Sequence, residues 1–331
     1  MKHKTFGDTI AYVNNLLDKN NEWEKRYKGY TEKIIANEER YILGRGKFII
    51  KSPFHLYTSI QKLNYYTVLN YDLRFNGQSV AKVFVKDNEV YIETNKKKVE
   101  TNKSHFNIKT VLKNENWGSN QSRKFRKEFK DCKIQHGRSK EHLIESDLLA
   151  EFSKSNSTNK RLCNIQPVRL CGMFFQFATP LMASKKEITY SNQYGGGIDI
   201  LARVRHLDNS VRLCVMELKD HNNGSEPPEK VMKQAIAYAS FLARLLRSDS
   251  GDEWYKIMGF SGNVPEKLII DAVIVMPYKH TLAPDNFVLE QYEVCKDTFL
   301  ELHTLYFTSS IGNLGKRLYD FQGTLKDTLL K

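Results

Sequence analysis

Three ionisable residues occur in two stretches of the chain that are otherwise apolar. Asp199 lies in the segment 195–201 (GGGIDIL), and Glu217 and Lys219 lie in the segment 211–219 (VRLCVMELK). A charged side chain in such an apolar strand is costly to bury unless an opposite charge, a hydrogen-bonding group or a metal ion accompanies it. The three residues are therefore candidates for a site with chemistry.

Their spacing predicts that the three side chains meet. Side chains alternate between the two faces of a strand, so Glu217 and Lys219 are expected on the same face. Asp208 and Asn209, which favour turns, lie midway between Asp199 and Glu217. A hairpin folded about that turn places Asp199 opposite Glu217, with the two carboxylates roughly 4–6 Å apart.

Two neighbouring carboxylates repel each other, and a hard divalent cation such as Mg²⁺ or Mn²⁺ relieves that repulsion. A bound cation polarises a phosphoryl oxygen and lowers the pKa of a bound water. A lysine beside it can orient the water or stabilise charge growing on phosphorus. This equipment is typical of phosphodiester hydrolysis. The alternative is a buried ion pair between Glu217 and Lys219, with Asp199 capping a turn.

The bulk composition is compatible with a nucleic-acid partner. The 331 residues include 51 Lys and Arg against 38 Asp and Glu, for a net charge of +13 and a pI near 9.3. Such an excess favours polyanions, nucleic acid well before an anionic membrane, although it also serves solubility. The sequence predicts no membrane span and no signal peptide. Five scattered cysteines without zinc or iron–sulfur spacing predict reduced thiols and a cytoplasmic protein.

Elements of alternating type surround the three residues, which predicts an α/β fold with a mixed sheet flanked by helices. A helix is expected over 141–152 with Ser139 as its N-cap, and another from Pro228 to about Arg247. A further helix is expected at the C-terminus. The expected strand-rich segments are 170–181, 188–204, 211–218, 268–276, 287–294 and 299–307.

The N-terminal part reads as a separate α+β module over residues 1–135, followed by a second domain over 136–331. Residues 1 to about 40 have helical periodicity, and a three-stranded meander is expected from the segments 68–75, 80–85 and 90–94. Residues 95–140 are basic, with Arg123, Lys124, Arg126 and Lys127 close together. This segment is either a phosphate-contacting surface or a solvated linker helix.

The order of elements over residues 139–277 resembles the PD-(D/E)XK nuclease superfamily. That family has a helix with an acid, a strand, a strand with Asp, a strand with E-x-K, a helix and a strand. In the helix that follows Lys219, Gln234 and Tyr238 fit the Q-x-x-x-Y pattern of the RecB-like branch, and the i, i+4 spacing puts them on one face. Ile198 stands where the family often has proline, and no iron–sulfur cysteines or helicase motifs are present.

The resemblance implies a restriction-endonuclease-like fold and assigns roles to individual residues. Asp199, Glu217 and the carbonyl of Leu218 would bind Mg²⁺ or Mn²⁺, and Lys219 would act on the attacking water. Gln234 and Tyr238 would support the site. The family also uses an acid on the first helix. Glu145 lies on the inward stripe of that helix and is our choice, with Glu141 second.

The sequence thus predicts a Mg²⁺-dependent deoxyribonuclease, most simply a DNA endonuclease. Enzymes of this fold that cut both strands often act as dimers, so a homodimer is a further expectation. Two alternatives stay open. One is a nucleic-acid-binding module that has the fold without turnover, and the other is an RNA- or structure-specific nuclease.

Overall fold

A computed structural model describes residues 5–51, 53–60, 68–95, 106, 108–129, 132, 140–154, 164–184, 187–193, 195–220, 226–278, 290–311 and 317–330. The predicted N-cap Ser139 and the beginning of the expected strand 287–294 lie outside these residues. The protein is of mixed α/β class, as the sequence predicts. In the described part, no helix is both long and apolar enough to span a bilayer.

The chain forms two compact units. The larger unit comprises residues 1–31, 148–168 and 176–331, and the smaller unit comprises 32–147 and 169–175. This division differs from the predicted boundary near residue 135, because the first helix belongs to the larger unit. Helix α1 (Phe6–Lys19) buries its apolar stripe, including Ile10, Val13 and Leu17. It packs against helix α6 (Pro228–Leu246), which lies more than 200 residues later in the chain.

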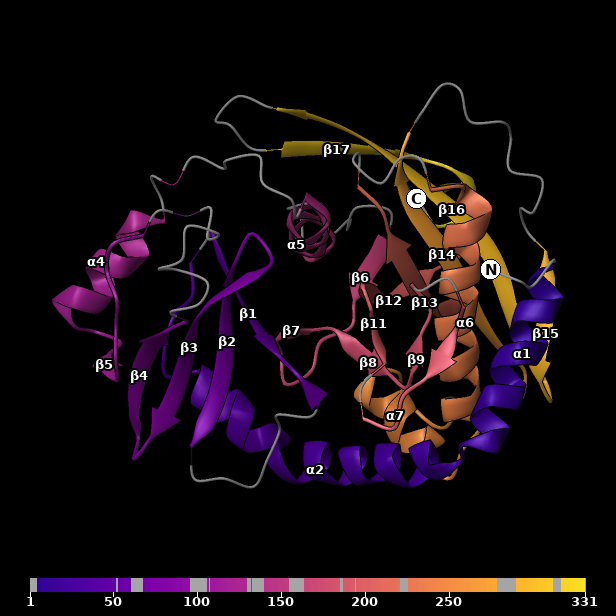
Figure 1. Ribbon diagram of the computed structural model, residues 1–331, viewed down its shortest axis with the longest axis horizontal. Helices are drawn as coiled ribbons and strands as arrows, with labels where there is room; N and C mark the ends of the chain where they lie inside the picture. The colour runs from indigo at the N-terminus through magenta and orange to yellow at the C-terminus, as the bar shows by residue number, and fades with distance from the viewer. Residues whose placement is uncertain are drawn as a thin grey trace. The chain divides into compact units, whose positions relative to one another are not determined.

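The larger unit is built on a seven-stranded mixed sheet (Figure 1). Its central strand, β14 (Leu268–Pro277), runs parallel to β13 (Val211–Leu218) and to β16 (Thr298–Ile311). All other pairings in the sheet are antiparallel, as hairpins allow. The remaining strands are β6 (Ile165–Pro167), β12 (Ile200–Arg205), β15 (Gln291–Cys295) and β17 (Arg317–Gln322). Strand β14 is buried almost throughout, which accounts for its nearly uninterrupted apolar sequence.

Helix α6 (Pro228–Leu246) packs along β13 and β14, with α1 beside it (Figure 1). Pro228 is the first residue of the helix, as predicted. Proline has no backbone N–H, but an N–H group in the first turn has no partner within the helix in any case. Two short helices, α7 (Gly251–Ile257) and α8 (Thr324–Thr328), also belong to this unit. The expected C-terminal helix is therefore only α8, and strand β17 precedes it unpredicted.

Two small strand pairs precede the sheet's central hairpin. Strand β8 (Phe177–Thr179) pairs with β11 (Gly196–Ile198), and β9 (Leu181–Met182) pairs with β10 (Thr189–Tyr190). Two residues of the glycine run 195–197 take part in this pairing. Gly196 and Gly197 are strand residues, and a Cβ on Gly195 would lie 2.6 Å from backbone atoms of residues 180 and 181.

The smaller unit contains a six-stranded sheet in the order β5-β4-β3-β2-β1-β7. The predicted meander is confirmed as β2 (Leu69–Phe75), β3 (Gln78–Lys86) and β4 (Glu89–Thr94). Strand β1 (Phe54–Thr58) pairs with β2 and, in parallel, with β7 (Phe174–Phe175). Strand β5 (Glu115–Asn116) forms the far edge.

Helix α4 (Asn120–Glu128) carries the basic cluster, and it is a packed element of the smaller unit. Phe125 and Phe129 are fully buried, and Phe129 contacts the rings of Phe54 and Phe75. This helix is therefore not a solvated linker. Helices α2 (Glu22–Arg45) and α5 (Lys140–Phe152) each contribute residues to both units.

Candidate active site on the central hairpin

The hairpin of β12 and β13 has the register that the sequence predicts. Ile200 pairs with Met216 and Arg205 pairs with Val211, so the hairpin is centred on Asp208. The side chain of Asp208 accepts a hydrogen bond of 2.9 Å from the backbone N–H of Ser210, and Asn209 has a φ of 64°. Asn tolerates this left-handed conformation, which fixes the turn and therefore the register. Continuing the register by one residue brings Asp199 beside Glu217.

Asp199 is held by the backbone of the opposite strand. It lies between β11 and β12, is half-buried, and accepts a hydrogen bond of 2.8 Å from the backbone N–H of Leu218 through Oδ2. A backbone donor orients the carboxylate without neutralising it. The bond also places Asp199 directly against the strand end that carries Glu217 and Lys219.

Glu217 and Lys219 lie on the same face, as the alternation of strand residues predicts. Their exposed fractions are only 5% and 6%, and Lys219 Nζ lies 3.1 Å from Glu217 Oε1. Lys219 follows β13, and its backbone N–H donates to the carbonyl of Val275 at 2.9 Å, so the strand path continues to this residue. The structure therefore brings Asp199, Glu217 and Lys219 together, and the ion pair considered as an alternative is also formed.

Helix α6 brings Tyr238 to the same neighbourhood. Tyr238 is buried, and its hydroxyl lies directly against Gly196, where a Cβ would collide with it. Gly196 lies in β11, three residues before Asp199, and Asp199 lies in the bend after that strand. The glycine thus permits a close approach between this strand and the tyrosine, which is one reason for its presence.

Gln234 lies one helical turn before Tyr238 and is almost completely buried. Its Oε1 has no hydrogen-bond partner among the described residues. A buried amide oxygen without a partner costs free energy, so its presence calls for a ligand or a water. An amide oxygen can act as a ligand of a hard cation, or it can accept a hydrogen bond from a water bound to such a cation.

Glu145 belongs to the smaller unit, whereas Asp199, Glu217 and Lys219 belong to the larger one. Glu145 is buried and Glu141 is half-buried, which agrees with an inward orientation of Glu145 on α5. His142 Nδ1 lies 3.3 Å from Glu145 Oε2, and this hydrogen bond raises the pKa of His142. The roles of Glu145 and of the Leu218 carbonyl as metal ligands stay predictions.

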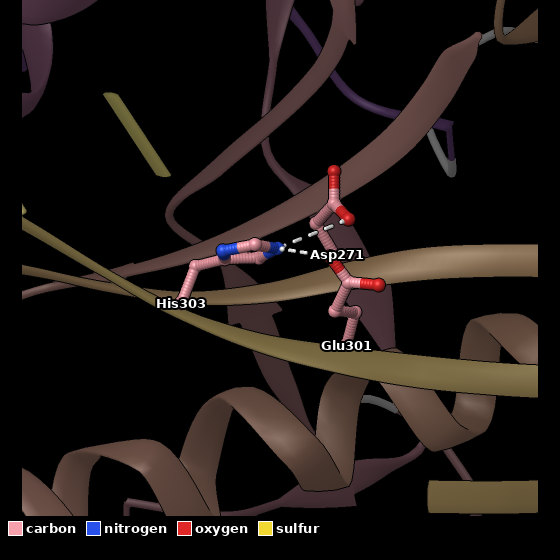
Figure 2. Close-up of side chains that lie close together, drawn as sticks. All are labelled: Asp271, Glu301 and His303. Atoms are coloured by element: carbon pink, nitrogen blue, oxygen red, sulfur yellow. Dashed lines mark ion pairs between the residues drawn. The ribbon is translucent and has the colours of Figure 1, made fainter. Parts of the chain in front are cut away.

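A second group of ionisable side chains on the same sheet was not predicted from the sequence. Asp271 on β14 and Glu301 and His303 on β16 lie close together (Figure 2). Asp271 is in register with Cys214, three residues before Glu217 on β13, so it lies on the opposite face of the sheet from Glu217. The sequence contains a sign of this group, since the charged Asp271 interrupts an apolar strand as Glu217 does.

Comparison of the chain with family models, with curated proteins and with solved structures yielded no match. The resemblance to PD-(D/E)XK nucleases therefore depends on the residues and their spacing.

Proposed function

We propose that this protein is a metal-dependent nuclease that hydrolyses phosphodiester bonds in DNA. The observation that carries the proposal is the convergence of Asp199, Glu217 and Lys219 at the end of the central hairpin. The three side chains together carry two negative charges and one positive charge, a set that a hard cation complements. The structural alternative, an ion pair between Glu217 and Lys219 with Asp199 bonded to the Leu218 N–H, uses the same three side chains, so metal binding is the property that separates the two.

The donor atoms of this group suit Mg²⁺ or Mn²⁺, with Asp199 and Glu217 as ligands. The bound cation would supply Lewis acidity toward a phosphate oxygen and a water. The N–H of Leu218 donates to Oδ2 of Asp199 and so fixes the orientation of this carboxylate.

Lys219 supplies positive charge next to the reacting phosphate in this proposal. Glu217 holds the ammonium at 3.1 Å and so restricts a flexible side chain to one position. A fixed ammonium can orient the attacking water and stabilise negative charge that develops on phosphorus. The buried setting strengthens the effect, because electrostatic interactions are weakly screened there.

Substrate affinity is expected to come mainly from surface cations. Arg123, Lys124 and Lys127 are exposed on α4 in the smaller unit. Arg123 and Lys127 line a hollow of about 360 Å³ together with Lys51. Phosphate contacts of this kind supply most sequence-independent affinity for nucleic acid. They explain the net charge of +13 as part of the function.

The test is a cleavage assay with the full chain on linear duplex, circular duplex and single-stranded DNA and on RNA. We expect cleavage of DNA with Mg²⁺ or Mn²⁺ and none with a chelator. Asp199→Asn should abolish it, whereas Asp249→Asn, an exposed control, should not. Glu145→Gln compared with Glu141→Gln decides which helix acid contributes.

Each outcome separates the candidates. Cleavage of RNA alone would move the proposal to an RNA nuclease. Metal and DNA binding without cleavage of any substrate would favour a binding module and would contradict the proposed activity.

A further inference from the structure

Five ionisable side chains gather on the face of the central sheet opposite Glu217. Asp271 comes from β14, Glu301 and His303 from β16, Arg212 from β13, and His206 directly follows β12. Asp271 and His303 have exposed fractions of 0%. All five belong to the larger unit, and none takes part in the proposed hydrolysis.

Three of these side chains present ligand atoms to one another (Figure 2). His303 Nε2 lies 3.2 Å from Glu301 Oε1 and 3.5 Å from Asp271 Oδ1, and the three atoms lie within 4.8 Å of one another. Ligand bonds of about 2.0–2.2 Å in a tetrahedral site put neighbouring ligand atoms roughly 3.3–3.6 Å apart. The two distances to His303 therefore suit a common metal ion.

The inner atoms of this group are not satisfied by hydrogen bonds. Within the described part of the chain, neither ring nitrogen of His303 makes a hydrogen bond, nor does Oδ1 of Asp271. His303 Nε2 lies within ion-pair distance of both carboxylates without meeting the geometry of a hydrogen bond. Buried polar atoms are nearly always hydrogen-bonded, and a metal ion is an arrangement that would satisfy these atoms.

Each carboxylate is oriented by a second partner through its other oxygen. His206 Nε2 lies 2.8 Å from Asp271 Oδ2, and Gln291 Nε2 donates to Glu301 Oε2 at 2.7 Å. These contacts turn Oδ1 of Asp271 and Oε1 of Glu301 toward His303. Outer partners that fix the orientation of ligands are a regular feature of metal sites.

We propose that Asp271, Glu301 and His303 form a second divalent metal site, distinct from the nuclease residues and suited to Zn²⁺ or another transition cation. One imidazole with two carboxylates selects such cations over Mg²⁺, which prefers oxygen ligands alone and keeps several waters. The site lies between β14 and β16, so an ion there would tie two strands of the sheet together.

Arg212 would compete with a metal ion for the two carboxylates. Its Nη1 lies 3.2 Å from Glu301 Oε1 and 3.5 Å from Asp271 Oδ1, the same oxygens that would bind a metal. Arg212 thus balances part of the charge of the two carboxylates, and a metal ion would take its place.

Arg212 can leave the carboxylates without losing all its partners. Its Nε lies 3.2 Å from Ser210 Oγ and its Nη2 lies 3.5 Å from Asp208 Oδ2, both in the hairpin turn. The Arg212 and Glu301 side chains retain exposures of 13% and 12%, so this edge of the cluster lies close to the surface. Removal of the guanidinium should therefore strengthen metal binding, whereas it should only weaken a purely ionic cluster.

The experiment titrates Co²⁺ and Zn²⁺ into the full-length Asp199→Asn/Glu217→Gln protein, in which the nuclease carboxylates are removed. Visible Co²⁺ absorption and calorimetry should show one equivalent bound and displaced by Zn²⁺. His303→Gln should weaken binding by about 100-fold or more, as expected for a lost ligand. Arg212→Gln should tighten it by about tenfold. Glu293→Gln, an exposed acid on β15, is the matched control and should change nothing.

His303 is buried, so the variant can also fail to fold, and the parent double variant supplies a second readout. Zn²⁺ should raise its Tm by several degrees while Mg²⁺ does not. Absence of a Co²⁺ band and of a Zn²⁺-dependent Tm overturns the proposal. So does unchanged binding in folded His303→Gln. Arg212→Gln that only lowers the Tm, without tighter metal binding, shows a structural ion cluster instead. None of these results depends on cleavage activity.

Discussion

The two faces of the central sheet hold ionisable groups that are arranged differently. On one face, Glu217 pairs with Lys219, and Asp199 is oriented by a backbone N–H. On the other face, Asp271 and Glu301 meet Arg212, His206 and His303. Charged residues in apolar strands therefore do not by themselves indicate catalysis. The two faces differ in the balance of charge and in what orients the carboxylates, which is a backbone N–H for Asp199 and side chains for Asp271 and Glu301.

The largest expected effect is on the cleavage rate, at the face that carries Asp199 and Glu217. Lys219→Met should lower the cleavage rate by about 10²–10³ or more, because the ammonium acts on charge that develops only in the transition state. Calorimetry should show that Mg²⁺ or Mn²⁺ binding survives, or tightens, once the repelling cation is gone. Lys256→Met, an exposed lysine on α7, is the control. Activity near wild type in Lys219→Met would remove the lysine from the mechanism.

The second prediction compares the stability contributed by one acid on each face. Asp271→Asn should lower the free energy of unfolding by about 3–5 kcal/mol, because Arg212 and His303 lose a buried counter-charge. Asp199→Asn should cost only about 1 kcal/mol, since the amide oxygen can still accept from the N–H of Leu218. Urea titrations of both variants give the two values. Equal losses would show that both faces are structural.

These expectations depend on how much of the molecule is fixed by local sequence. The hairpin that joins Asp199 to Glu217 was predictable, since the turn at Asp208-Asn209 and the alternation of strand residues are local. Asp271 stands out in its apolar strand in the same way, but its partners in the cluster were not predictable. They come from β13, β16 and the residue after β12, whose neighbours depend on the sheet order. The stripe on α1 is visible in the sequence, but its partner α6 is not.

A third and smaller effect concerns the contact between Gly196 and Tyr238. Gly196→Ala should destabilise the protein by about 1–3 kcal/mol, since the added methyl group collides with the tyrosine hydroxyl. Tyr238→Phe removes that hydroxyl, so the double variant should recover much of the loss. A double-mutant cycle of urea unfolding measures this coupling. Additive losses would mean that the glycine is needed for another reason.

The smallest effect is expected outside both faces, on the exposed surface of α4. Replacing Arg123, Lys124 and Lys127 by alanine should weaken DNA binding and reduce the log–log salt slope by roughly 0.9 for each lost phosphate contact. Arg126 is excluded because its guanidinium lies 3.9 Å from the centre of the Trp117 ring and donates to the Trp117 carbonyl. Unchanged affinity and slope in a binding titration would make these charges merely solubilising.

The central claim is that the face with Asp199 and Glu217 binds the catalytic cation. Anomalous diffraction from crystals soaked in Mn²⁺ tests it most directly. The account predicts a peak roughly 2.1 Å from a carboxylate oxygen of each residue, lost in Asp199→Asn. Manganese bound elsewhere in the crystal, with no peak between Asp199 and Glu217, would contradict it.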